Sequence, residues 1–186
     1  PSAFSIHRAA RLIVLLAALA TVTHHVGAQA WQLDPTFAPV IVNDDISDAI
    51  TNVIVMPTSD GRILLSGRFN RVDDVNVRSL ARFNRDFTLD RSFAAELAPN
   101  ERFVSAAPLA DGRVLMAIDA ARFDYRIVRL HADGRRDQSF SALAVTGPLQ
   151  LWPLPGGAVL ARGNFSLIGG QVFRGIARFD PSGTLE

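Results

Sequence analysis

The sequence predicts an all-β protein built from propeller-like blades of about four antiparallel strands each. Two observations carry this prediction. Three short motifs recur together along the chain, and the members of the first two motifs are between 45 and 51 residues apart. The segments between them contain glycine and proline too often for helices, and no apolar stripe with a 3.6-residue period persists. Four short strands in a unit of this length are typical of a propeller blade.

The first repeated motif predicts a hairpin turn. Asp60-Gly61 recurs as Asp111-Gly112 and, in decayed form, at Gly157, so that the glycines are 51 and then 45 residues apart. An Asp-Gly pair suits such a turn because the carboxylate caps it and glycine adopts a positive φ at little cost. The clearest hairpin is predicted over residues 52–69.

The second motif is an arginine within a short apolar strand, and its members are 47 and 49 residues apart: Arg82, Arg129 and Arg178. Because side chains alternate along a strand, each arginine points away from its apolar neighbours. We expect these arginines to pair with the repeated acids Asp90 and Asp137. If substitution of Arg129 left stability unchanged in a denaturant titration, this hypothesis would fail.

The third motif, Leu-Asp-x-Ser-Phe and its variants, closes each unit and predicts a short fourth strand. Its aromatic residues are predicted to lie in the core between blades: Phe37, Phe93 and Phe140. The three motifs divide the chain into approximate units 31–93, 94–140 and 141–186.

The first unit brings all the motifs together in residues 60–64, 66–70, 80–83 and 89–93. This combination resembles the delta-60 repeat of a bacterial domain family of unknown function. The resemblance covers nearly all of residues 31–186 and implies a secreted or surface-exposed β-propeller, often joined to other extracellular modules. It provides no catalytic residue. The second unit departs from the pattern, because residues 118–120 (Ile-Asp-Ala) replace an expected Gly-x-Phe.

Residues 1–30 have the pattern of a secretory signal peptide. Arg8 and Arg11 precede an apolar run over residues 12–22, and Ala28 and Ala30 fit a cleavage site before Trp31. The run is too short for a transmembrane anchor, which needs about 20 residues. We therefore expect a secreted, cell-surface or periplasmic protein without a transmembrane segment in its mature chain.

Composition excludes several functions. The chain has no cysteine, and all 19 of its basic residues are arginine, which excludes thiol, Schiff-base lysine and cysteine-ligated metal chemistry. Removal of the leader leaves 17 arginines against 18 acidic residues, so no basic surface favours nucleic acid. We predict no cofactor and no metal site.

The number of repeats predicts an incomplete propeller. About three units are present, whereas about four to eight blades typically close a ring. We interpret the sequence as part of a longer chain whose further blades are its first partners. An isolated arc of three blades would leave an apolar flank uncovered, which favours association.

The few candidate catalytic or binding side chains have ordinary structural explanations. His131 lies in a repeated turn whose equivalent positions hold Asn84 and Asp180, so turn chemistry explains it better than a catalytic triad does. Two acidic pairs in predicted loops allow glycoside hydrolysis or calcium binding without the spacing of a known calcium loop: Asp44 with Asp45, and Asp73 with Asp74. Trp31 is able to stack on a sugar, whereas Trp152 lies in an apolar strand that predicts core.

These observations favour an exported, non-enzymatic β-propeller that serves as a surface recognition or scaffold module. Its ligand would be a surface protein or a carbohydrate, bound by loops instead of by the repeated residues. The alternative is a propeller-type glycan hydrolase or lyase that uses loop carboxylates. A purely structural spacer is a third possibility.

Overall fold

The computed structural model describes residues 11–13, 40–42 and 53–186. Within these residues the regular structure consists of strands and one short 3₁₀ turn, η1 (Pro155–Gly157).

Most strands form three successive antiparallel sheets, here named the first, second and third blades. The first blade contains β3 (Ile54–Pro57), β4 (Ile63–Ser66) and β7 (Leu80–Phe83). The second contains β8 (Arg102–Pro108), β9 (Val114–Asp119), β10 (Tyr125–Leu130) and β11 (Leu143–Val145). The third contains β12 (Leu149–Pro153), β13 (Val159–Gly163) and β16 (Ile176–Phe179).

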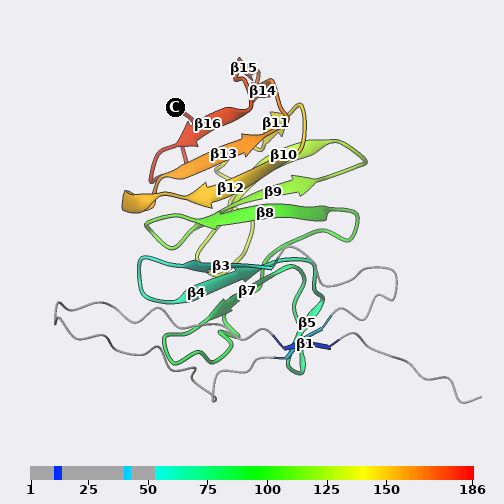
Figure 1. The fold of residues 1–186 in the computed structure, drawn as a ribbon, viewed down its shortest axis with the longest axis vertical. Helices are drawn as coiled ribbons and strands as arrows, with labels where there is room; N and C mark the ends of the chain where they lie inside the picture. Colours follow the sequence, from blue (N-terminus) through cyan, green and yellow to red (C-terminus); the bar gives the residue numbers. More distant parts are fainter. Residues whose placement is uncertain (1–10, 14–39, 43–52) are drawn as a thin grey trace, which may run out of the picture.

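The three blades are stacked in chain order, with β8 between β3 and β12 (Figure 1). The first strands of consecutive blades are therefore neighbours, as they are around a propeller axis. The predicted fold class, antiparallel propeller blades in an incomplete ring, is confirmed: the described blades form an open arc.

The repeated turns join the first two strands of each blade, with Asp-Gly in the first two blades and Gly-Gly in the third. Gly61, Gly112 and Gly157 have φ angles of +79°, +85° and +83°. Asp60 Oδ1 accepts a hydrogen bond of 3.2 Å from the backbone N–H two residues later, and Asp111 Oδ1 accepts the equivalent bond of 3.1 Å. These contacts explain why aspartate followed by glycine recurs at this place.

The connection between the second and third strands differs among the blades. In the first blade it contains a small hairpin of β5 (Arg71–Val72) and β6 (Val75–Asn76), and in the third it contains β14 (Leu167–Ile168) and β15 (Gln171–Val172). In the second blade a tight loop over residues 120–124 joins β9 directly to β10. The departure at residues 118–120 thus marks a real change in loop structure.

Two further strands precede the first blade. β1 (Arg11–Ile13) pairs antiparallel with β2 (Val40–Val42), and β2 pairs antiparallel with β5. The rest of the predicted leader, and Phe37 with its motif, lie outside the described residues.

The predicted fourth strand is wrong in its position. The Leu-Asp-x-Ser-Phe segments form only single bridges to the third strands: Phe83 to Leu89, Leu130 to Arg136, and Phe179 to Leu185. The chain turns immediately afterwards because Asp90 Oδ1 accepts the backbone N–H and the hydroxyl of Ser92, a local turn that competes with a strand. In the second blade the fourth strand, β11, comes later.

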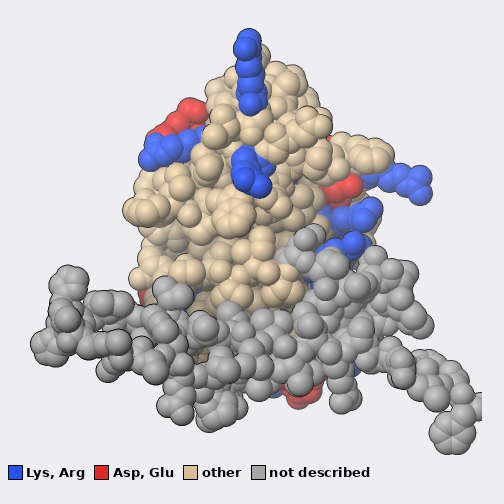
Figure 2. Space-filling view, viewed as in Figure 1, with Lys and Arg blue, Asp and Glu red and all other residues tan. Residues whose placement is uncertain are grey.

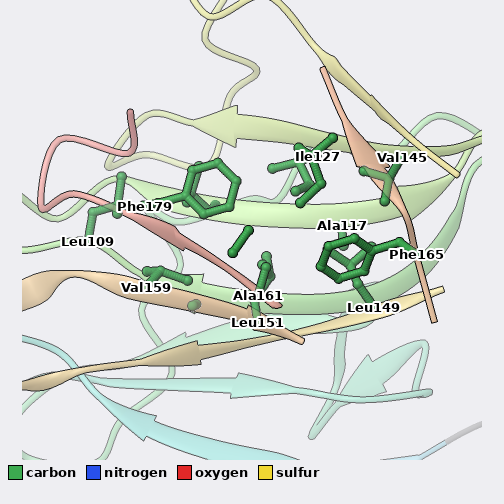
Figure 3. Close-up of a cluster of buried hydrophobic side chains, with 14 residues drawn as sticks. Leu109, Ala117, Ile127, Val145, Leu149, Leu151, Val159, Ala161, Phe165 and Phe179 are labelled. Carbon is green, nitrogen blue, oxygen red and sulfur yellow. The ribbon is translucent and has the colours of Figure 1, made fainter. Parts of the chain in front are cut away.

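Apolar residues on both faces of the sheets form the cores between blades. In β13, Val159 and Ala161 are fully buried against the second blade, whereas Leu160 between them is only partly buried. Figure 3 shows Phe179 and Phe165 toward the two ends of this cluster, with Leu151 and Ala161 between them. Every residue of β9 is buried, because the second blade has a neighbour on each side.

Two glycines with similar backbone conformations provide a matched test of blade packing. A Cβ on Gly134 (φ +92°) would collide with the backbone carbonyl of Ala94 in the segment that leaves the first blade, whereas a Cβ on Gly112 would meet only Ala132 at 3.7 Å. We predict that Gly112→Ala lowers the free energy of unfolding by about 1 kcal/mol, the cost of a left-handed alanine. Gly134→Ala should cost at least about 1 kcal/mol more, because backbone must also move. Urea titration of both variants measures the difference, and equal losses would contradict the packing described.

Candidate functional site

The repeated arginines and acids form ion pairs within each blade. Arg82 Nε donates to Asp90 Oδ2 at 2.8 Å, and Arg129 Nε donates to Asp137 Oδ2 at 2.7 Å. Both acids are almost fully buried. The pairing inferred from the repeat is therefore present in the first two blades, and each charge that leaves water gains a charged partner.

The repeated phenylalanine rings pack against the arginines of these ion pairs. The guanidinium carbon of Arg82 lies 4.7 Å from the ring centre of Phe93, and that of Arg129 lies 4.8 Å from Phe140, distances that allow cation–π attraction. Phe93 is buried between the first and second blades, whereas Phe140 is only partly buried at the edge of the next core. Each phenylalanine thus contributes packing and covers the ion pair.

A second arginine approaches each buried acid. Arg62 Nη1 lies 3.3 Å from Asp90 Oδ2, and Arg113 Nη1 lies 3.8 Å from Asp137 Oδ2. Both come directly after an Asp-Gly turn, and Ala158 replaces them in the third blade. The sequence analysis missed this role, although the recurrence of arginine after Asp-Gly was the available signal.

The same arginines connect neighbouring blades. Arg82 Nη1 donates to the carbonyl oxygen of Ala132 at 2.5 Å, and Arg129 Nη1 donates to that of Ser182 at 3.0 Å. Each acceptor lies in the turn after the third strand of the next blade. In the third blade, Arg178 pairs with Glu186, which stands where the other units have aspartate. The repeated cluster is therefore a scaffold that holds one blade to the next.

Hydrogen bonds hold the pKa of Asp137 well below its usual range. The hydroxyl of Ser139 donates to Oδ1 at 2.6 Å and its backbone N–H donates at 3.0 Å, while Arg129 donates to Oδ2. These contacts favour the ionised form and outweigh burial, which raises the pKa. For Asp90, burial is the largest single influence, yet hydrogen bonds from Ser92 and Arg82 together also lower its pKa.

The candidate catalytic side chains do not converge. His131 is half exposed in its turn, with Nε2 3.7 Å from Asp137 Oδ1. Asp73 and Asp74 lie in the turn between β5 and β6, and Asp74 forms an exposed ion pair of 3.2 Å with Arg91. Asp44 and Asp45 lie outside the described residues. In the part of the chain that the structure describes, no three histidine or acidic side chains form a metal-binding group.

The prediction for Trp152 is wrong. Its side chain is 42% exposed on the outer face of the third blade instead of lying in the core. In β12 the buried residues are Leu149 and Leu151, which point toward the second blade, so strand alternation turns Trp152 to the opposite face. Trp31 lies outside the described residues.

The loop over residues 120–124 is the most unusual surface feature of the second blade. Arg122 and Phe123 are consecutive non-glycine residues with positive φ angles, +38° and +76°. Such conformations cost about 1–3 kcal/mol each and persist only where surrounding contacts impose them. The backbone N–H of Ala120 donates to the carbonyl oxygen of Asp124 at 2.9 Å, and Asp119 Oδ1 accepts the N–H of Phe123 at 2.9 Å. The buried Asp119 thereby fixes the loop.

This strained loop holds an aromatic side chain in water. Phe123 is 80% exposed, more than any other large apolar residue in the described part of the chain. Beside it, Arg126 donates hydrogen bonds to the Asp124 carboxylate from Nε at 3.1 Å and from Nη2 at 2.7 Å. An exposed aromatic anchor within a polar rim is the arrangement found at protein interaction sites. No sequence signal other than the departure from the repeat marked this loop.

Charged side chains are sparse on the broad face over β8 and β12. Figure 2 shows this face as largely uncharged, with arginine and acidic side chains gathered mostly toward its margins. The ends of the strands carry the Asp-Gly turns on one side and the loop with Phe123 on the other. The charged side chains and the exposed Phe123 are thus concentrated in turns and loops.

Comparison with known proteins agrees with the fold. Residues 58–93 and 157–186 match the family described as a domain of unknown function (DUF5122) beta-propeller. The two segments lie in the first and third blades, and each runs from the turn between the first two strands into the closing motif. The chain is thus similar to a β-propeller repeat family of unknown function. No curated protein and no solved structure matches it. No helix in the described residues is long and apolar enough to span a membrane.

Acid should lower the free energy of unfolding because the pKa of Asp137 is lower in the folded protein than in the unfolded chain. Because its folded pKa lies below the unfolded value of about 3.9, its contribution is complete above about pH 4 and is lost as the pH falls below that value. We predict that the free energy of unfolding falls more between about pH 6 and pH 3 in the wild type than in Asp137→Asn. Urea titrations at both pH values measure this, with Asp133→Asn as the control for loss of one negative charge. An identical fall in wild type and Asp137→Asn would contradict the prediction.

Proposed function

We propose that this chain is an exported, non-enzymatic β-propeller module of the delta-60 repeat type that recognises a protein partner at the cell surface. The observation that carries the proposal is the 120–124 loop, which keeps Phe123 in water at a cost in backbone strain. In a loop that binds no partner, substitutions that relieve the backbone strain are expected to accumulate, unless the strained conformation serves a purpose.

A protein partner is favoured over a carbohydrate. Phe123 has an apolar ring without a polar group, and its rim consists of Arg122 and the Asp124–Arg126 pair. A hydrophobic anchor of this kind inserts into a pocket from which water is excluded, and charged rim groups steer the encounter. The repeated arginines and acids are already used between blades, which supports a division between scaffold and loop.

The uncovered outer face of the third blade supports the expectation of further blades. Trp152 and Ile176 are exposed there at 42% and 59%. An apolar sheet face of this kind is an association site in an isolated protein. Further blades of a longer chain would pack against it and complete the scaffold that presents the loop.

Export predicts a specific new N-terminus. If residues 1–30 are a cleaved leader, the protein recovered outside the cytoplasm should begin at Trp31. Replacing Arg8 and Arg11 by glutamate should leave uncleaved protein in the cell, because the positive region that orients the leader is lost. N-terminal sequencing and cell fractionation measure both. Exported protein that still begins before residue 31 would contradict cleavage.

Recognition predicts that Phe123→Ala strongly weakens binding without unfolding the protein. Binding to a panel of cell-surface proteins and glycans should weaken at least about thirtyfold, the effect of losing an interface hot spot. Val172→Ala is the matched control, because Val172 is 76% exposed in a regular strand. Urea titration should show Phe123→Ala within about 0.5 kcal/mol of the wild type.

The same screen separates the rival functions. Unchanged binding by Phe123→Ala would refute the role of the loop, and glycan binding alone would replace the protein partner by a carbohydrate. Turnover of a glycan that is lost in Asp73→Asn or Asp74→Asn would instead favour the hydrolase or lyase. Absence of any ligand would favour a structural spacer.

A further inference from the structure

The segment that leaves the first blade lies in an extended form against a turn of the second blade. The backbone N–H of Ala94 donates to the carbonyl oxygen of Asp133 at 2.9 Å, and that of Glu96 donates to the carbonyl oxygen of Gly134 at 2.9 Å. The Glu96 carboxylate then accepts the backbone N–H of Arg136 at 2.7 Å. This short Ala-Ala-Glu segment therefore fills the space between the two blades with main-chain and carboxylate contacts.

The equivalent segment after the second blade takes a different path. Counted from Phe93 and Phe140, residues 141–143 stand where the first unit has Ala-Ala-Glu. Leu143 begins β11, which pairs with β10 on one edge and with the hairpin of the third blade on the other. Because residues 141–143 lead into this strand, they form no backbone hydrogen bonds with the turn over residues 180–184 in the described structure.

A groove of about 380 Å³ is open between the second and third blades at this place. Ser141 and Leu143 line it from the segment that leaves the second blade, and Gly183 and Leu185 line it from the turn of the third. Gln171 of the third-blade hairpin lines it as well. Clefts of about 300–1,000 Å³ are typical of ligand sites. The groove thus corresponds to the space that Ala-Ala-Glu fills between the first and second blades.

The turn that borders the groove carries the same main-chain groups as its equivalent in the second blade. Gly183 corresponds to Gly134, and Leu185, which forms a bridge with Phe179, corresponds to Arg136. Among the described residues, neither the carbonyl oxygen of Gly183 nor the N–H of Leu185 has a hydrogen-bond partner. Gly183 is buried, where a polar group without a partner costs free energy. One acceptor and one donor are therefore left for an occupant.

The charge of the groove favours a carboxylate. Of the side chains that line it in the described structure, only that of Arg129 is charged. Asp137 binds the Nε of this arginine, whereas its Nη2 has a long contact of 3.5 Å to Ser139 Oγ and keeps a hydrogen to donate. An acidic group that enters the groove thus meets a guanidinium and no like charge.

We propose that this groove binds an extended segment of a partner protein, with a glutamate in the place that Glu96 takes at the first junction. The backbone N–H of that glutamate donates to the carbonyl oxygen of Gly183, and its carboxylate accepts the N–H of Leu185 beside Arg129. Main-chain bonds then provide affinity and the carboxylate provides specificity. The site is separate from the Phe123 loop and does not depend on the function proposed for that loop.

A peptide copied from the chain tests the proposal: Ala-Ala-Glu-Leu-Ala, the sequence of residues 94–98, with acetylated and amidated ends. In an NMR titration of the full ¹⁵N-labelled chain, the amide proton of Leu185 should shift downfield, because it gains a charge-assisted hydrogen bond. Saturation is expected at millimolar peptide, since a short peptide makes few contacts. The same peptide with glutamine in place of glutamate should bind at least about fivefold more weakly, because a neutral acceptor forms a weaker hydrogen bond.

Two substitutions of Ser141 form a matched pair, because this residue is exposed in the groove and the variants differ only in charge. Ser141→Glu should weaken peptide binding at least about fivefold at low ionic strength through repulsion of like charges, whereas Ser141→Gln should retain most of it. Urea titration verifies that both variants fold. Phe123→Ala should bind the peptide as the wild type does, so failure of this site and failure of the Phe123 loop are distinguishable.

Three results would each overturn the proposal: an unchanged Leu185 amide at saturating peptide, equal binding of the glutamate and glutamine peptides, or equal binding by the two Ser141 variants. Acetate is the final probe. If acetate alone causes the same shifts at the same concentration, the groove binds a small anion and recognises no peptide, which also overturns the proposal.

Discussion

Each of the three blades carries apolar residues on both faces, so each requires a neighbour on either side. The second blade meets this requirement, and all six residues of β9 are buried as a result. At the third blade the same pattern leaves Trp152 and Ile176 in water. The stacked arrangement and the exposed flank therefore follow from one constraint, the burial of apolar surface.

Apolar packing alone does not fix how one blade sits on the next, because it has little directional preference. Hydrogen bonds from the arginines are directional and fix this arrangement. Arg82 and Arg129 each bind a buried carboxylate in their own blade and a carbonyl oxygen in the following one. A buried pair of this kind adds little net stability but would be costly to break, which favours a single arrangement of the blades.

The division between scaffold and loop follows from these contacts. The charged residues that recur have their partners within and between blades, so the proposed recognition falls to residues outside the repeat. The loop around Phe123 arises where the hairpin of the other two blades is missing, and the buried Asp119 holds it in a conformation that most residues avoid. A repeated fold can thus acquire an individual surface through one shortened connection.

The sequence by itself determined the class of fold, the Asp-Gly turns, the third strand over residues 80–83 and the pairing of Arg82 and Arg129 with their acids. These features repeat and depend on neighbouring residues or on one unit. Only the tertiary structure decided that Trp152 faces water, that the closing motif turns instead of forming a strand, and that Phe123 stands exposed. The faces of a strand are equivalent until a neighbouring sheet covers one of them, and loop strain depends on contacts such as Asp119 with Phe123 that carry no repeated signal.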